Sequence, residues 1–274
     1  MQQKPGSTVG TAPGVEVQTF SKVRIRFRKD GDLRLVSHHD LMHVFERMLR
    51  RAGIEFCSTQ GFHPKPRLVF AQSLALGLVG CQEVADLEHS DSATDEELLH
   101  KLSEQTPPGL TLHSIKTIPP RSKTQVNRVC YGLALPAARV AAAREQANEL
   151  LSKSECWIER TRPNLRQLNI RPFVRGIDFQ EDRIEIDIWI GPYGTARPEE
   201  ILEQLGLVDL WQQGELLYRT TLELIDEMEN PESRPAFLNQ PGQPQQGKAK
   251  PNKVKKPDKV KPESLVQGPL SFDS

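Results

Sequence analysis

Residues that could perform chemistry gather in SHHDLMHVFERMLRRAG, at positions 37–53. His38 and Asp40 could act as a catalytic acid and base, but such a pair needs hydrogen-bond contact. Residues two positions apart on a helix point to different faces, so these two side chains do not meet. Ser37 is a typical N-cap with Asp40 in the position of a capping-box acid, and an anion at this helix start would also meet His38. The segment therefore predicts an anion site, and catalysis by His38 and Asp40 stays open as an alternative.

His39 and His43 are four residues apart, a separation that two metal ligands on one helix face can use. The glutamate of an HExxH zinc motif is absent, and a third ligand from His38, Asp40 or His63 would depend on tertiary contact. The spacing is more typical of two exposed histidines on a polar helix face. No metal site is predicted, and His39 and His43 are the candidates if one exists.

The loop GFHPKPR, at residues 61–67, is more distinctive. Gly61 permits a tight turn, and Pro64 and Pro66 stiffen the chain around Lys65 and Arg67. A stiff loop loses less conformational entropy when it presents cations to a ligand. The loop is therefore predicted to contact an anion.

Further cations surround these motifs. FSKVRIRFRK, at residues 20–29, alternates apolar and basic positions, which predicts a half-buried strand with a cationic outer face. Two explanations stay open, because these cations could bind phosphate or RNA, or could pair with nearby carboxylates. The nearby cations on the helix are Arg47, Arg50 and Arg51, and the candidate carboxylates are Asp30, Asp32, Glu46 and Glu55.

A second arginine-rich segment, ERTRPNLRQLNIRPFVRG at residues 159–176, contains Arg171 and no acid after Glu159. RNA-binding sheets usually offer exposed aromatic rings for stacking. This chain has only 10 Phe, 3 Tyr and 3 Trp, which favours contacts to the RNA backbone if nucleic acid is bound.

The composition excludes several classes of protein. Lys+Arg and Asp+Glu are equal at 36 each, and the four cysteines show no CxxC or CxxxCxxC spacing, so neither an iron–sulfur cluster nor structural zinc is expected. GxxxxGK[ST], GxGxxG and GxSxG motifs are also absent, and no cofactor is predicted. No apolar run is long enough for a signal peptide or a membrane span, so a cytoplasmic protein is expected.

Apolar periodicity predicts strands and helices in alternation. In the first half, the expected strands are 20–29, 33–37, 54–59, 68–77, 83–89 and 110–118, with a hairpin turn at 29–32 and helices between Ser37 and Gly53 and over 94–105. In the second half, the expected strands are 126–135, 156–161, 183–190 and 217–224, with helices over 138–152 and 197–206. This order predicts an α+β fold of two ferredoxin-like α/β-sandwich lobes with mainly antiparallel sheets.

The expected boundaries are a flexible lead over residues 1–18, a first lobe over 19–122, a second lobe over 123–228 and a Lys/Pro-rich tail over 229–274. The tail segment KAKPNKVKKPDKVKP, at 248–262, holds seven lysines and cannot bury a core. It is predicted to stay extended, either simply solvated or as a low-specificity anchor on RNA or another polyanion.

Taken together, RIRFRKDGDLRLVSHHD, DLMHVFERMLRRAG, STQGFHPKPRLVFA and the later NIRPFVRG resemble the radical-SAM-linked protein family. Its members are often fused to, or encoded beside, a B12-binding-type radical SAM protein. Positions His39, His43, His63 and Asn169 depart from the family pattern. The resemblance implies that the functional positions are those matching the pattern, namely Ser37, His38, Asp40, Gln60, Gly61, Phe62, Pro64, Pro66 and Arg67.

The resemblance implies an accessory domain that works with a separately encoded radical SAM enzyme, with structured RNA as the expected substrate. We therefore expect a non-catalytic module that recognises RNA or an RNA-associated substrate. Two alternatives stay open: an enzyme, either a hydrolase or an RNA-modifying activity, that uses His38 and Asp40; and a protein–protein adaptor that never touches RNA.

Overall fold

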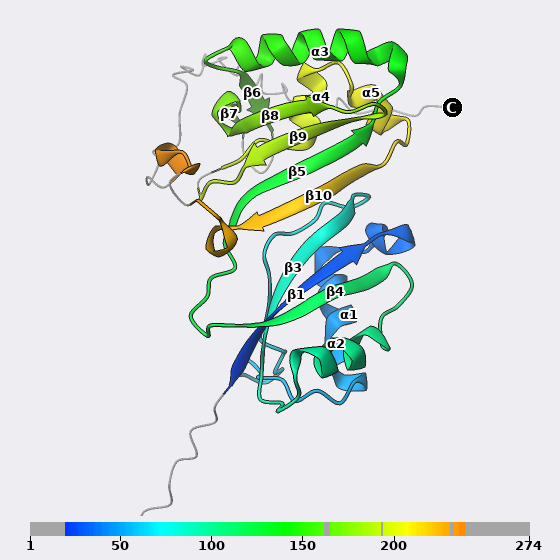
Figure 1. The fold of residues 1–274 in the computed structure, drawn as a ribbon, viewed down its shortest axis with the longest axis vertical. Coiled ribbons are helices and arrows are strands. Elements are labelled where there is room, and N and C mark those ends of the chain that lie inside the picture. Colours follow the sequence, from blue (N-terminus) through cyan, green and yellow to red (C-terminus); the bar gives the residue numbers. More distant parts are fainter. Residues whose placement is uncertain (1–19, 162–164, 193, 231–232, 239–274) are drawn as a thin grey trace, which may run out of the picture.

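The computed structural model describes residues 20–161, 165–192, 194–230 and 233–238 (Figure 1). The predicted lead over residues 1–18 and most of the predicted tail lie outside this part of the chain. Within it, an eight-stranded sheet has the order β4-β1-β3-β10-β5-β9-β8, and β2 pairs with β3. The predicted α+β fold with mainly antiparallel strands is confirmed.

The first half of the chain follows the order strand, helix, two strands, helix, strand. Its elements are β1 (Ser21–Lys29), α1 (His38–Arg51), β2 (Leu68–Phe70), β3 (Val79–His89), α2 (Asp95–Ser103) and β4 (Leu110–Ile118). The spatial order β4-β1-β3-β2 is the ferredoxin-like arrangement, and all its pairings are antiparallel. Val23, Ile25 and Phe27 of β1 face α1 and α2 and form one hydrophobic core with them.

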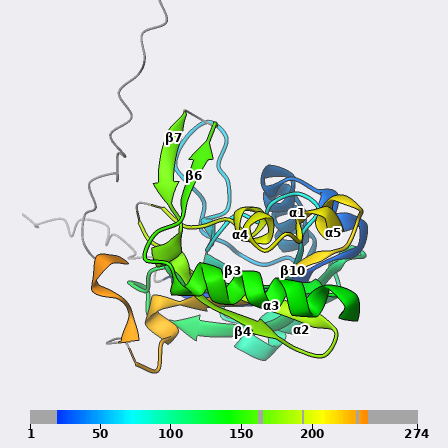
Figure 2. The same cartoon turned by 90° about the horizontal axis from the view of Figure 1, so that it is seen from above.

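The second half repeats this order of elements. They are β5 (Val126–Ala134), α3 (Ala137–Ser152), β8 (Val174–Phe179), β9 (Arg183–Trp189), α4 (Pro198–Gln204), α5 (Val208–Gln212) and β10 (Leu217–Leu224). A hairpin of β6 (Trp157–Arg160) and β7 (Arg166–Asn169) is inserted after α3 and projects away from the main sheet (Figure 2). Ile184, Ile186 and Ile188 form the centre of the second core.

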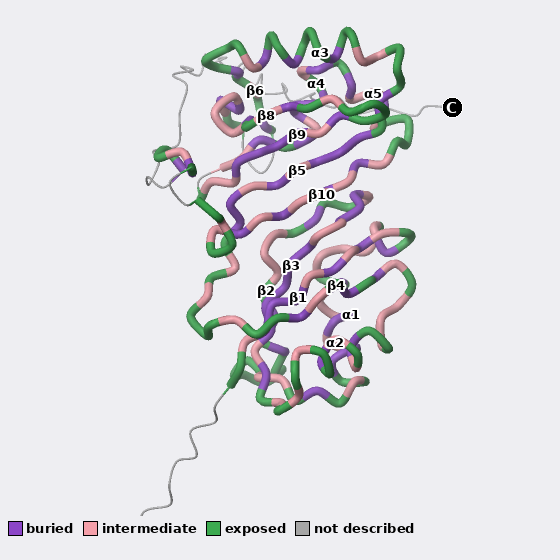
Figure 3. The backbone as a smooth tube through the Cα atoms, in the orientation of Figure 1, coloured by how far each residue is buried: buried purple, intermediate pink, exposed green. Residues whose placement is uncertain are grey.

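One sheet runs through both halves because β3 pairs in parallel with β10, at Val79–Tyr218 and Gly80–Arg219. Buried residues follow the strands through both halves, while the exposed positions lie mainly on the helices and loops (Figure 3). The second core also includes Leu74 and Leu78 from the first half. The halves therefore share packing as well as backbone pairing.

Three of the predicted strands are wrong or much shorter. Residues 29–37 form no hairpin, because Gly31–Leu35 is a 3₁₀ helix that begins at a glycine with φ +52°. The strand predicted over 54–59 is reduced to isolated bridges at Phe56 and Ser58, and the one over 68–77 keeps only Leu68–Phe70. β7, β8 and α5 were not predicted.

The 3₁₀ turns Ile225–Glu227 and Ala236–Leu238 follow β10. Arg234 is buried and donates hydrogen bonds to the Asn127 and Ile190 carbonyls, and Leu238 is buried as well. Residues 233–238, which the composition places in the tail, therefore pack against the second half.

Candidate functional site

The loop over residues 57–67 has a fixed base. The Thr59 N–H donates to the Lys65 carbonyl at 2.8 Å, and the Arg67 N–H donates to the Cys57 carbonyl at 2.8 Å. Cys57 and Arg67 are in turn hydrogen bonded to the backbone of Glu88 on β3. These bonds close the loop as a hairpin-like projection that is anchored to the sheet.

The tip of the same loop is open to solvent. Phe62 is fully exposed, and Gln60, Gly61, Pro64 and Lys65 are exposed as well. Gly61 adopts φ +141°, which an L side chain rarely takes, so glycine is required at this turn. A fully exposed aromatic ring on an anchored loop is available to contact a partner.

The start of α1 has the predicted Ser37 N-cap, but Asp40 does not complete a capping box. The Ser37 hydroxyl accepts the Asp40 N–H at 3.2 Å and donates to the Asp40 carboxylate at 2.6 Å. The His38 ring packs edge-on against Phe70, with 5.2 Å between ring centroids. The Asp40 carboxylate therefore holds the hydroxyl of the Ser37 N-cap, and no hydrogen bond is found between Asp40 and His38 in the described part of the chain.

The loop and the helix start lie at opposite ends of α1. In the last turn, the Arg50 guanidinium lies 5.6 Å from the centre of the Phe56 ring, immediately before the loop. A helix of 14 residues is about 20 Å long, so Ser37 lies far from this end. The structure does not bring the two motifs together into one anion site.

The predicted arginines have different surroundings. Arg50 pairs with Glu46 at 3.0 Å, and Arg67 pairs with Glu88 at 3.0 Å, while Arg47 and Arg51 are exposed. Arg171 donates to the carbonyls of Val174 and Leu151 at 2.9 and 2.8 Å. Arg171 therefore joins the start of β8 to the end of α3, which is a structural role.

His39 and His43 do lie together, with 4.6 Å between ring centroids. Within the described residues, no group of three or more histidine, cysteine, aspartate or glutamate side chains could hold a metal ion. His43 also lies 3.6 Å from the Glu46 carboxylate.

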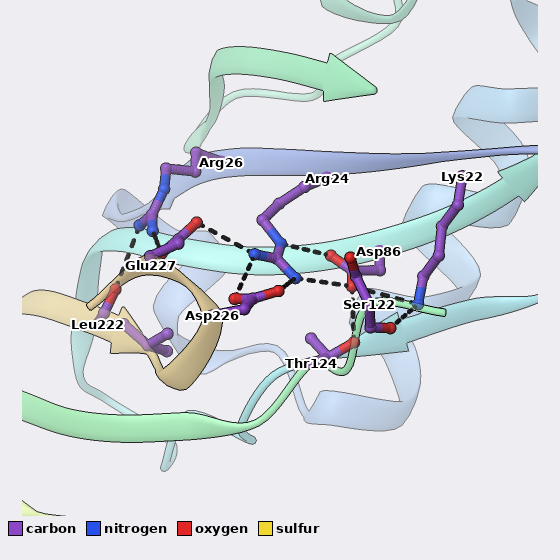
Figure 4. Close-up of polar contacts among 9 residues, drawn as sticks. All are labelled: Lys22, Arg24, Arg26, Asp86, Ser122, Thr124, Leu222, Asp226 and Glu227. Carbon is purple, nitrogen blue, oxygen red and sulfur yellow. Dashed lines mark hydrogen bonds and ion pairs between the residues drawn. The ribbon is translucent and has the colours of Figure 1, made fainter. Parts of the chain in front are cut away.

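The predicted cationic face of β1 is neutralised by tertiary contacts (Figure 4). Arg24 donates to Asp86 at 2.9 and 3.2 Å, to Asp226 at 2.8 and 3.1 Å, and to Glu227 at 3.2 Å. Arg26 pairs with Glu227 and donates to the Leu222 carbonyl. Of the two explanations left open for these cations, pairing with carboxylates holds for Arg24 and Arg26, and the strand offers a charge-balanced surface.

A pocket of about 550 Å³ opens on this polar face of the sheet, between the two halves. Its main charged and aromatic lining residues are Arg26, Arg128, Arg175, Trp189, Glu223, Glu227 and Glu229. Apart from Arg26, which belongs to the basic face of residues 20–29, these residues were not predicted as a site. The signal in the sequence was an alternating strand position for Arg26, Arg128, Trp189 and Glu223, and the arginine-rich segment for Arg175. Glu227 and Glu229 lie beyond β10 and carried no such signal.

Cys130 lies on the same strand face as Arg128. Its burial, together with the nearby Asp187 carboxylate, raises the pKa of Cys130 to about 12. Because the thiolate is the nucleophile, we expect Cys130 to react with iodoacetamide roughly a thousandfold more slowly than an ordinary cysteine of pKa near 8.5. Timed alkylation at pH 8 with mass spectrometry measures this, with urea-unfolded protein as the control. Equal labelling rates in the native and unfolded protein would contradict the expectation.

On the opposite face, a buried group of charges lies where β3 meets β10. Arg219 donates through Nε to Glu83 at 2.8 Å and also contacts the carbonyls of Gln72 and Ser73. Lys29 is 1% exposed and donates to the Val36 carbonyl at 2.7 Å. Burial lowers the pKa of Lys29, and Glu83 opposes this effect. The contacts among Arg219, Glu83 and nearby carbonyls therefore compensate the charges that are buried at the junction of the halves.

These features define an α+β protein of two joined ferredoxin-like halves, with a charge-balanced sheet face and an anchored, exposed loop. The family described as "Uncharacterized protein conserved in bacteria (DUF2344)" matches residues 22–199, so the chain belongs to this family. No curated protein matches the chain. None of the helices in the described part of the chain is long and apolar enough to cross a membrane.

The chain is also similar to a solved structure, that of an unknown protein from Galdieria sulphuraria. The identity is 12%, and the match covers 75% of this chain and 98% of the other, with a TM-score of 0.24. A similarity at this TM-score supports no conclusion about fold or function.

Proposed function

We propose that the protein is a non-catalytic cytoplasmic module that recognises RNA, or an RNA-associated substrate, for a separate radical SAM enzyme. The observation that carries the proposal is the loop over residues 57–67, whose base is anchored and whose tip presents Phe62 to solvent. Exposed aromatic rings are the platforms on which single-stranded bases stack.

Cations beside the ring would add contacts to phosphate. Lys65 is exposed two residues before Arg67, and Arg67 is about half exposed although it pairs with Glu88. Proline on both sides of Lys65 restricts the backbone and reduces the entropy lost on binding. The loop therefore combines a stacking surface with salt-sensitive charge, as expected for an RNA contact.

The test is fluorescence anisotropy of a single-stranded RNA with the full-length protein and its Phe62→Ala variant. Loss of one stacked base is expected to weaken binding roughly 5- to 150-fold, because each stacking contact contributes about 1–3 kcal/mol. Lys65→Ala is expected to lower the slope of log affinity against log salt by about 0.7.

The lysines of the tail could bind RNA by themselves, so the matched control is the full-length protein with the seven lysines of 248–261 replaced by glutamine. If the loop carries recognition, this variant still loses affinity on Phe62→Ala. The proposal would be contradicted if RNA binding is lost when the tail lysines are replaced and is unchanged by Phe62→Ala.

A protein–protein adaptor is the second candidate, and the full exposure of Phe62 also favours it, because a large apolar side chain in solvent is typical of a contact residue. Copurification with a radical SAM enzyme after nuclease treatment, lost on Phe62→Ala, would support the adaptor over RNA recognition. The enzyme alternative has less support, since the Asp40 carboxylate bonds the Ser37 N-cap and His38 packs on Phe70.

A further inference from the structure

The pocket on the polar sheet face is lined by residues from both halves of the fold. Arg26 comes from β1, Arg128 from β5 and Trp189 from β9, while Glu229 and Ser233 come from the segment after β10. Its volume of about 550 Å³ lies within the range of small-ligand pockets, about 300–1,000 Å³. Such a pocket can hold one planar group together with its substituents.

Charge in the pocket is already balanced. Arg26 pairs with Glu227, and Arg128 pairs with Glu223 at 2.5 Å and with Asp187 at 3.0 Å. A phosphate group entering the pocket would meet the carboxylates of Glu223, Glu227 and Glu229 as well as the arginines. The pocket therefore favours an uncharged ligand with hydrogen-bond donors and acceptors over a small anion.

A flat cationic surface lies within the pocket. The Arg175 guanidinium lies 5.3 Å from the centre of the Trp189 ring and pairs with Asp187. The Arg175 side chain is about half exposed, whereas Trp189 is buried, so the ring supports the guanidinium from beneath. Nucleobases stack on arginine planes as well as on aromatic rings.

Around this surface lie polar groups that can form hydrogen bonds with the edge of a stacked base. The Gln82 amide and the Thr221 hydroxyl line the pocket from β3 and β10, and the Glu223 carboxylate can accept hydrogen bonds. A neutral, planar ligand with hydrogen-bond donors and acceptors would therefore match this lining better than an aliphatic ligand.

We propose that the pocket binds one unstacked nucleobase of the RNA, stacked on Arg175. This inference rests on the proposed function, because it assigns a second RNA contact on the sheet face in addition to the loop. The two contacts are tested separately, because a free nucleoside can fill the pocket without reaching the loop.

The experiment is isothermal titration calorimetry of the full-length protein with adenosine, guanosine, cytidine and uridine, each repeated in excess inorganic phosphate. At least one nucleoside is expected to bind, and phosphate is expected not to compete. Arg175→Ala is expected to weaken binding roughly tenfold or more. Arg175→Lys is expected to weaken binding to a similar extent, because lysine keeps the positive charge but lacks the planar guanidinium on which a base can stack.

Arg183→Ala is the matched control, since Arg183 is about half exposed on β9 and does not line the pocket. Circular dichroism melting confirms that each variant is folded. Competition by phosphate, unchanged binding in Arg175→Lys, or no binding of any nucleoside would overturn the inference.

The results also separate this inference from the proposed function. If RNA binding depends on Phe62 but no nucleoside binds, the nucleobase site in the pocket is ruled out and RNA recognition by the loop still stands. Nucleoside binding that depends on Arg175, in a protein that binds no RNA, would support the pocket as a nucleoside site and overturn its assignment to RNA.

Discussion

Replacing Arg219 with methionine is expected to lower the free energy of unfolding by about 3–5 kcal/mol. The Arg219 side chain is 1% exposed and pairs with Glu83, whose side chain is 5% exposed. Removing the guanidinium leaves the Glu83 carboxylate buried without its main partner, which costs more than the pair itself contributes. Urea denaturation followed by circular dichroism measures the change.

The double variant Glu83→Met with Arg219→Met is the decisive comparison. Replacing both partners removes the uncompensated Glu83 carboxylate but also takes from the buried Lys29 the carboxylate that supports its charge, so the double variant is expected to recover part of the lost stability. Gly80 leaves room for the Glu83 side chain, because a Cβ atom at residue 80 would lie 2.5 Å from the Glu83 Cγ atom. An Arg219→Met variant as stable as the native protein would show that the junction does not depend on this pair.

The second large effect is expected for Arg24→Met, which should lower the free energy of unfolding by about 2–4 kcal/mol. Arg24 is 5% exposed and joins Asp86 of β3 to Asp226 beyond β10. Without it, the buried Asp86 keeps only Lys22 at 3.5 Å and the Thr124 hydroxyl at 2.8 Å. The same urea titration applies, because urea adds no ionic strength.

Asp226→Asn provides the matched control for Arg24→Met. The Asp226 side chain is 34% exposed, so solvent screens its contact with Arg24, and the expected loss is below about 1 kcal/mol. Equal losses for the two variants would mean that burial of Arg24 does not decide the strength of the cluster.

Local features of the sequence predicted most secondary structure correctly. Ser37 and Thr94 cap α1 and α2 through their side chains, and Thr94 forms the full capping box with Glu97. β4 and β10 begin and end where their alternating pattern predicts. Caps and periodicity depend on residues within a few positions of one another, so they can be read without a partner segment.

Predictions failed where a local pattern fits more than one structure. Residues 33–37 alternate like a strand, yet Leu35 is exposed and only Leu33 of the 3₁₀ helix is buried. The chain over 68–77 carries strand-forming residues, but only Leu68–Phe70 pair with β3. Strand formation requires a neighbour, and no local pattern shows how far that neighbour extends.

The sequence by itself determined the two ferredoxin-like halves, the capped α1 and the stiff loop, because these depend on short-range patterns. Only the tertiary structure decided what the cations do. Arg24 meets Asp86 and Asp226 from positions 62 and 202 residues away, and the pocket joins Arg26 to Ser233. Ion pairs form between side chains that sheet register brings within hydrogen-bond distance, and register between distant strands is set by the packing of the whole core.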